Sequence, residues 1–196
     1  MSKADAKTLA YIGSKPGQKA PARDSDAWFT PSFYVDLVRH ALGGSIDFDP
    51  FSSDVAQETV AAKKYYTIDD DALVTPWPKV GTVFMNPPYS RGLCGKAVQA
   101  FIAAFDQGKF RRGIVLVNNA TDTTWWAGLT SHPGCVALCL THGRVAFENA
   151  DGKAVSGNTR GQAFILFQGG TPQDTRNAKK QFKMYFDNPS VGRVWQ

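Results

Sequence analysis

The chain has 196 residues and a mass of 21.4 kDa, which suits one folded domain and excludes a large multidomain machine. With 43% apolar and 20% charged residues, it has the composition of a globular protein. It shows no apolar run of about 18 residues and no secretory signal, so we expect a cytoplasmic protein without a membrane anchor. Its net charge of +5 favours a polyanionic partner.

The first 27 residues are rich in Ala, Lys, Gly and Pro without an apolar period, and they predict a flexible N-terminal arm over residues 1–27. Thr30-Pro31 predicts the start of a helix, with Thr30 capping it and Pro31 in its first position. Apolar residues at spacings of three and four then continue to Ala41.

Strands and helices alternate in the middle of the chain. We expect strands at 45–49, 65–68, 81–85, 113–117, 135–140 and 163–167, and helices at 53–64, 93–106 and 121–130. Asp151-Gly152 predicts a hairpin over about 144–155, and residues 171–196 read as a basic C-terminal tail. The pattern predicts an α/β protein with a Rossmann-like, doubly wound, mostly parallel sheet and an antiparallel terminal hairpin. Ligands of such sheets bind where the strands end.

Asn86-Pro87-Pro88-Tyr89 follows the clearest of these strands. The two prolines remove backbone donors and make the turn rigid, so the Asn86 amide oxygen and the Pro87 carbonyl can accept both protons of one planar amino group. Tyr89 adds an aromatic face on which a base can stack, worth about 1–3 kcal/mol. The simpler interpretation is a turn that only ends the strand.

Several segments in this order resemble the amino-group, adenosylmethionine-dependent DNA methyltransferases, and most closely the phage-type (Dam-like) DNA N6-adenine methyltransferases. The resemblance covers the chain from Trp28 to about Phe167, and only its fourth segment is specific alone. The segments are Trp28-Phe29-Thr30-Pro31, Asp47-Phe48-Asp49-Pro50-Phe51, Asp70-Asp71-Ala72-Leu73, Phe84-Met85-Asn86-Pro87-Pro88-Tyr89-Ser90, and Val117-Asn118-Asn119-Ala120-Thr121-Asp122-Thr123-Thr124-Trp125-Trp126. It implies a methyltransferase domain over residues 28–170.

The resemblance also implies the residues that bind S-adenosyl-L-methionine. Those that match the family's cofactor segments are Trp28, Thr30, Pro31, Asp49, Pro50, Phe51, Asp70 and Asp71. Asp49 would receive the cofactor's ammonium, and Asp71, or less favourably Asp70, would bind the adenine amino group. Ser52-Ser53 departs from the glycine-rich turn of many relatives, which leaves the acid that binds the ribose unassigned. A run of three aspartates is equally typical of a solvated loop.

The resemblance implies a DNA adenine that is flipped out of the duplex into a pocket of Asn86, Pro87 and Tyr89. The hairpin region at about 143–161 offers a small recognition element with Arg144, Lys153, Asn158 and Arg160. Basic residues at 109–112 and 179–183 are further candidates for phosphate contacts.

Two alternative functions stay open: methylation of another planar amine (cytosine N4, an RNA adenine or a protein glutamine), and DNA binding without turnover. The sequence also leaves the oligomeric state open. The three histidines and three cysteines show no ligand spacing, so we expect no metal.

Overall fold

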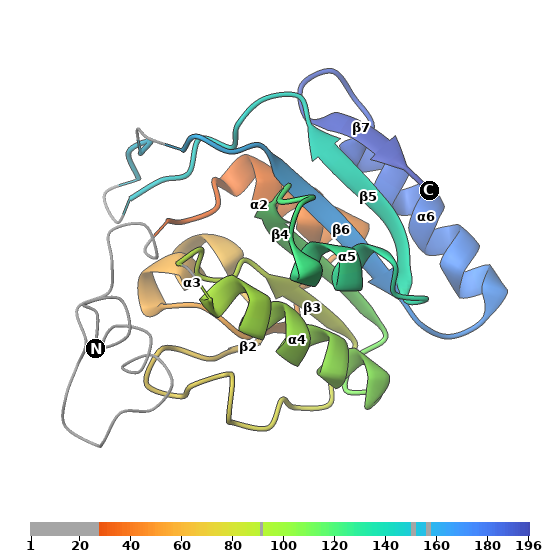
Figure 1. Cartoon of the computed structure of the whole chain (residues 1–196), viewed down its shortest axis with the longest axis horizontal. Helices are drawn as coiled ribbons and strands as arrows, with labels where there is room; N and C mark the ends of the chain where they lie inside the picture. The colour runs from red at the N-terminus through yellow and green to blue at the C-terminus, as the bar shows by residue number, and fades with distance from the viewer. Residues whose placement is uncertain (1–27, 91, 150–151, 156–157) are drawn as a thin grey trace.

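The computed structural model describes residues 28–90, 92–149, 152–155 and 158–196, so the predicted arm at 1–27 lies outside the described residues (Figure 1). One seven-stranded sheet has the order β2-β1-β3-β4-β6-β5-β7. The strands are β1 (Phe48–Asp49), β2 (Lys64–Tyr65), β3 (Thr82–Met85), β4 (Arg112–Asn118), β5 (Cys135–Thr141), β6 (Gln162–Gln168) and β7 (Gly192–Trp195). The helices are α2 (Ser32–Ala41), α3 (Asp54–Val60), α4 (Leu93–Asp106), α5 (Thr124–Thr130) and α6 (Pro172–Phe186).

The sheet is mixed. β1 pairs in parallel with β2 and β3, and β3 pairs in parallel with β4. β6 lies between β4 and β5 and is antiparallel to both, so β1 to β5 share one direction and β6 runs against them. This confirms the predicted α/β, Rossmann-like fold. The sheet, which we expected to be mostly parallel, is parallel from β2 to β4 and antiparallel from β4 to β7.

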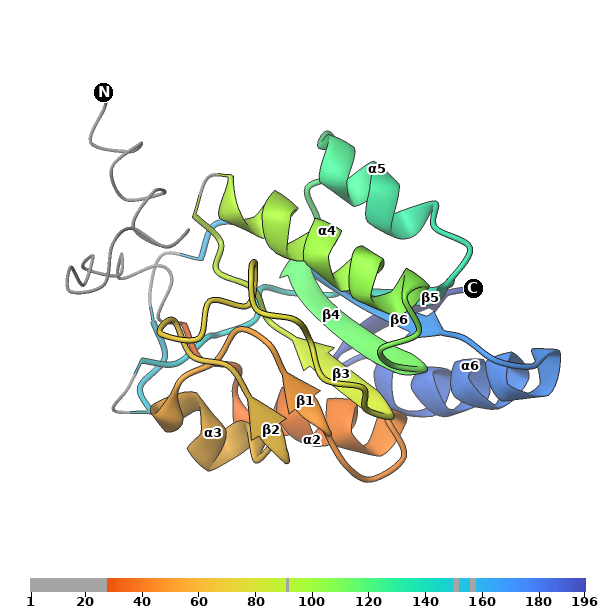
Figure 2. The same cartoon turned by 90° about the horizontal axis from the view of Figure 1, so that it is seen from below.

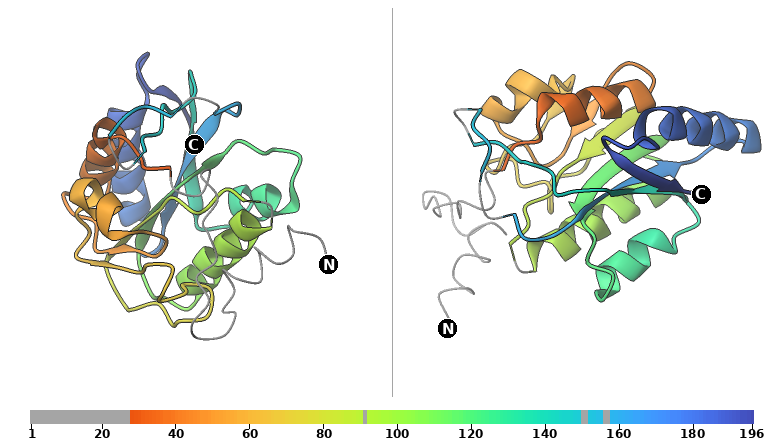
Figure 3. Two further views of the ribbon diagram at one scale, coloured as in Figure 1. Left: turned by 90° about the vertical axis from the view of Figure 1, so that its left-hand side faces the viewer. Right: turned by 90° about the horizontal axis from the view of Figure 1, so that it is seen from above.

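Helices cover both faces of the sheet. α2, α3 and α6 lie on one face, and α4 and α5 lie on the other (Figures 2 and 3). Alternate residues of the central strands feed the two cores: Leu116 and Phe164 pack on the first side, and Val115 and Ile165 pack on the second. Strands covered on both faces consist of continuous apolar runs, which explains why β4 and β6 could be predicted from the sequence. None of the described helices is long and apolar enough to span a bilayer.

The prediction that residues 171–196 form a basic C-terminal tail is wrong, because this range folds into a helix and a strand that belong to the domain. Thr171 and Asp174 form a capping box that starts α6, and β7 pairs with β5 at the edge of the sheet. Ala178, Phe182 and Phe186 are fully buried against the first core. These three residues, spaced four apart among polar ones, form a narrow apolar stripe, and that was the missed signal of a packed helix.

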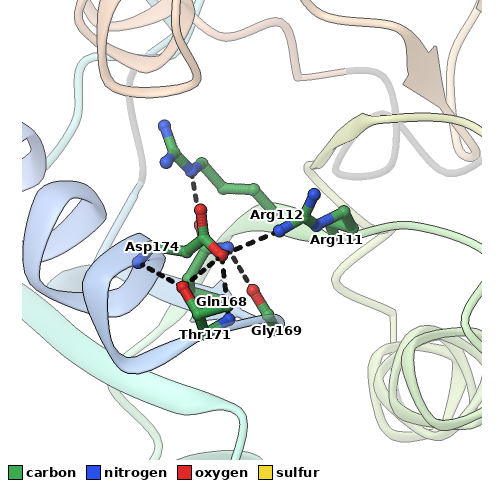
Figure 4. A network of polar contacts seen from close by, with 6 residues as sticks. All are labelled: Arg111, Arg112, Gln168, Gly169, Thr171 and Asp174. Carbon is green, nitrogen blue, oxygen red and sulfur yellow. Dashed lines mark hydrogen bonds and ion pairs between the residues drawn. The ribbon is translucent and has the colours of Figure 1, made fainter.

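A network of polar side chains joins α6 to the sheet at the amino end of β4 (Figure 4). Arg112 donates to the side-chain oxygens of Gln168 (2.6 Å) and Gln181 (3.1 Å), and Arg111 donates to Asp174 (2.9 Å). Two of the basic residues considered for phosphate contacts are therefore engaged within the protein.

Candidate active site at the carboxyl edge of the sheet

The parallel half of the sheet gathers the predicted site residues at one edge. β2, β1, β3 and β4 are neighbours in that order and run in one direction, so their carboxyl ends lie side by side. Asp49 ends β1, Asn86 follows β3 and Asn118 ends β4, while Asp71 lies in the segment after β2. This is the edge where open α/β sheets bind their ligands.

The carboxamide of Asn86 is held by the segment before α2. Its Nδ2 donates to the carbonyl oxygen of Trp28 (3.3 Å) and to Oγ1 of Thr30 (3.2 Å). Thr30 is only 4% exposed, and its side chain does not cap α2, because Pro31 occupies the N-cap position without a side-chain hydrogen bond. The predicted helix cap is therefore wrong, and the hydroxyl contacts Asn86 instead.

Tyr89 reaches the other end of the same carboxamide. Its hydroxyl lies 2.8 Å from Asn86 Oδ1 and 3.2 Å from the Leu116 carbonyl oxygen, so its single proton has two acceptors. Burial raises the pKa of Tyr89 well above its ordinary value of 10, which keeps the phenol a neutral donor. The half-buried ring contacts Phe147, with ring centroids 5.8 Å apart.

Phe147 and Glu148 were not among the predicted site residues. Phe147 stacks on Trp28 with centroids 5.7 Å apart, and Glu148 exchanges both backbone hydrogen bonds with Phe29, each at 2.9 Å. The loop between β5 and β6 is thereby joined to the segment that holds Asn86. Val145 and Phe147 are buried and the small Ala146 between them is exposed, so two large apolar residues at a spacing of two were the available signal that one face of this loop is buried.

Asp49 is a buried acid without a cation. It is 4% exposed, and it accepts hydrogen bonds from the Phe51 amide (3.3 Å) and from Gln57 Nε2 (3.0 Å). Burial raises its pKa to about 7, against the lowering effect of these uncharged donors. No cation pairs with it in the described part of the chain. Pro50 is buried and Phe51 half-buried beside it.

The structure separates the adjacent aspartates Asp70 and Asp71. Asp70 is exposed, and its Oδ2 accepts from the amide (2.8 Å) and hydroxyl (3.1 Å) of Thr67, which closes its own turn. Asp71 is buried with a left-handed φ of 51°, and its Oδ1 accepts from the Leu73 amide (3.1 Å). Its Oδ2 is buried without a hydrogen-bond partner among the described residues. A buried polar atom without a partner is uncommon, so Oδ2 of Asp71 is an acceptor that could bind a ligand.

The four residues considered for nucleic-acid contact divide into two groups. Arg144, Lys153 and Arg160 are exposed on the loop between β5 and β6. Asn158 is half-buried: its Nδ2 donates to the Val145 carbonyl (3.0 Å), and its Oδ1 accepts from Gln162 Nε2 (3.2 Å). The Asn158 side chain thus holds the loop together, and its polar atoms are used within the protein instead of being presented to base edges.

Comparison with known proteins identifies the family of the chain. A family model described as DNA N-6-adenine-methyltransferase (Dam) matches residues 17–183. A protein of Escherichia phage T1 named "DNA N-6-adenine-methyltransferase" is 25% identical over 168 residues, a match that covers 78% of this chain and 66% of that protein. Because the family model covers most of the chain, the chain belongs to the Dam family of DNA N-6-adenine-methyltransferases.

Proposed function

We propose that the protein transfers a methyl group from S-adenosyl-L-methionine to the N6 amino group of adenine in DNA. The observation that carries this proposal is the carboxamide of Asn86 at the carboxyl end of β3. Its amide nitrogen is committed to Trp28 and Thr30, so its oxygen faces a donor, which is the Tyr89 hydroxyl in this structure.

The target amine would replace that hydroxyl. An adenine amino group delocalises its lone pair into the ring, and the lone pair must be localised on nitrogen before it attacks a methyl group. Asn86 Oδ1 and the Pro87 carbonyl would accept the two amine protons and so favour the localised form. The Tyr89 proton would turn to the Leu116 carbonyl, which already lies 3.2 Å away, while the Tyr89 ring stacks on the base.

The described residues fit the proposed cofactor. The buried, cation-free carboxyl of Asp49 suits the ammonium of the methionine moiety, and the unpaired Oδ2 of Asp71 suits the amino group of the adenine moiety. Trp28, Pro31, Pro50 and Phe51 would border these two groups. When bound, the cofactor would supply an electrophilic methyl group and remain as S-adenosylhomocysteine, and the methylated amine would lose one of its protons to give N6-methyladenine. The role of the chain is to fix the acceptors around the amine that receives it.

DNA would enter from the same edge, with the target adenine flipped out of the duplex. Arg144, Lys153 and Arg160 are exposed on a loop that touches the segment holding Asn86, and the net charge of +5 favours the DNA backbone. Such a protein would act in the cytoplasm, where the DNA of a phage or its host is found.

Nucleoside mass spectrometry tests the proposal. Unmethylated duplex DNA is incubated with the protein and S-adenosyl-L-methionine, then digested and analysed. We expect N6-methyladenine. N4-methylcytosine alone would move the target to another planar amine. Cofactor binding without any methylated base would point to RNA or protein as the substrate, and no cofactor binding would point to a DNA-binding module without turnover.

A further inference from the structure

The two ends of an asparagine carboxamide have nearly the same shape, so its neighbours decide which end faces the substrate. Nδ2 of Asn86 lies 3.3 Å from the Trp28 carbonyl, which accepts hydrogen bonds only, and 3.2 Å from Oγ1 of Thr30. If the group were turned over, Oδ1 would face the Trp28 carbonyl, and two acceptors would repel each other. The Trp28 carbonyl, which can only accept, therefore decides that Nδ2 faces this segment and Oδ1 faces away from it, and the Thr30 oxygen, accepting from the same Nδ2, holds the carboxamide in that position.

Thr30 is fixed in place by contacts on either side of it. Phe29 exchanges two backbone hydrogen bonds with Glu148, and Trp28 stacks on the buried Phe147. The Thr30 hydroxyl is buried and does not cap α2. Its hydrogen bond to Asn86 joins positions 56 residues apart in the chain.

We propose that Thr30 is a positioning residue, whose hydroxyl holds the Asn86 carboxamide with Oδ1 toward the amine that is methylated. This inference rests on the proposed function of Asn86 and assigns Thr30 a role through that residue. It differs from the role that the resemblance implies for Thr30, which is to bind the cofactor.

Two substitutions at Thr30 and one control separate the roles. Thr30→Val keeps the shape of the side chain and removes the acceptor, whereas Thr30→Ser keeps the hydroxyl. Thr130→Val is the matched control, because the Thr130 hydroxyl also makes one hydrogen bond (2.9 Å, to the Trp126 carbonyl) but lies in α5 on the other face of the sheet. The readouts are kcat at saturating cofactor and DNA, and the Kd of S-adenosyl-L-methionine by calorimetry.

Thr30→Val should lower kcat about 5- to 10-fold, the effect of one hydrogen bond, and leave the cofactor Kd within about two-fold of wild type. Thr30→Ser should restore kcat to within about two-fold, and Thr130→Val should leave it unchanged. An unchanged kcat in Thr30→Val would overturn the inference. A weaker cofactor Kd with unchanged kcat would assign Thr30 to the cofactor, and a loss that Thr30→Ser does not restore would assign it to packing.

A readout without turnover keeps this inference separate from the proposed function. The side-chain amide protons of Asn86, identified by NMR from their loss in Asn86→Asp, should exchange slowly in wild type and in Thr30→Ser and faster in Thr30→Val. Equal exchange in all three proteins would refute the positioning role. A wild-type protein that forms no methylated base would instead refute the proposed function.

Discussion

Asp47 directly precedes β1 and Asp49 ends it, yet the pKa values of these two acids are shifted in opposite directions. Partial burial would raise the pKa of Asp47, but Lys63 (2.7 Å) and the amides of Thr82 and Gly81 together hold it below its ordinary value. Asp49 pairs with no cation among the described residues, and burial raises its pKa to about 7. Lys63 thus balances the charge of Asp47, whereas under the proposed function the ammonium of the cofactor would balance that of Asp49.

Other polar groups at the amino and carboxyl edges of the sheet differ in the same way. At the amino edge, Arg112 donates to two glutamine side chains and to the Ala41 carbonyl, and these contacts fasten α2 and α6 to β4. At the carboxyl edge, the Tyr89 hydroxyl has two acceptors for one proton, and in the segment after β2 the Asp71 Oδ2 atom has no hydrogen-bond partner among the described residues. Polar groups at the amino edge build the fold, whereas those at the carboxyl edge remain available to ligands.

The largest effect on cofactor binding is expected at Oδ2 of Asp71, which has no partner among the described residues. Asn tolerates the left-handed backbone there but offers one acceptor in place of two, so Asp71→Asn cannot serve both the Leu73 amide and a ligand. The Kd of S-adenosyl-L-methionine should rise about 10- to 100-fold, as measured by calorimetry. Asp70→Asn is the matched control, because Asp70 only closes its own turn. An equal loss in both variants would contradict the distinction between them.

Removing the hydrogen bonds of Arg112 at the amino edge should lower the stability of the fold without slowing methyl transfer. Arg112→Met keeps the aliphatic stem and removes the hydrogen bonds to Gln168 and Gln181, so the free energy of unfolding in urea should fall by about 1–2 kcal/mol. The rate of methyl transfer per folded molecule should stay within about two-fold of wild type. A rate loss of more than about ten-fold in folded protein would show that this edge takes part in the reaction.

The last prediction is that the stability contributed by Asp47 and the stability contributed by Asp49 change with pH in opposite directions. The stability from Asp47, whose folded pKa is lowered, is present above about pH 4 and lost as the pH falls further, so Asp47→Asn should cost about 0.5–1 kcal/mol at pH 7 and less in acid. Asp49, whose folded pKa is about 7, binds its proton more tightly when folded, so its contribution falls as the pH rises from about 4 to about 7.

Asp49→Asn should therefore gain stability relative to wild type between about pH 5 and pH 8, by about 1 kcal/mol or more. Urea unfolding at several pH values measures both variants without a ligand. Parallel pH dependences for the two substitutions would contradict the contrast between the two acids.

The elements of the fold that were predicted correctly are those that a pattern of neighbouring residues specifies. β4 and β6 are apolar runs, and the strand before Asn86 is ended by two prolines, so both the strand and the position of the motif follow from neighbouring residues. α6 was missed because its apolar stripe is narrow and lies within a basic, polar segment.

The sequence predicts site residues that belong to a local motif, but it does not predict the contacts that these residues make with distant parts of the chain. The contact of Thr30 with Asn86 and the stacking of Trp28 on Phe147 join residues far apart in the chain, which no local pattern specifies. Asp70 and Asp71 are adjacent and chemically identical in sequence, and only the backbone conformation buries one and exposes the other. Asn158 was considered for DNA contact because no local pattern shows that its side chain bonds to Val145, 13 residues away on the same loop, and to Gln162, 4 residues away at the start of β6.

The most direct test of the carboxyl edge as the reaction centre is Asn86→Ala, measured as the rate of N6-methyladenine formation at saturating cofactor and DNA. The substitution removes the acceptor for the target amine and leaves Asp49 and Asp71 in place. The rate should fall at least about 100-fold, while the Kd of S-adenosyl-L-methionine stays within about two-fold of wild type. Turnover within about ten-fold of wild type, or a parallel loss of cofactor binding, would contradict the role assigned to Asn86.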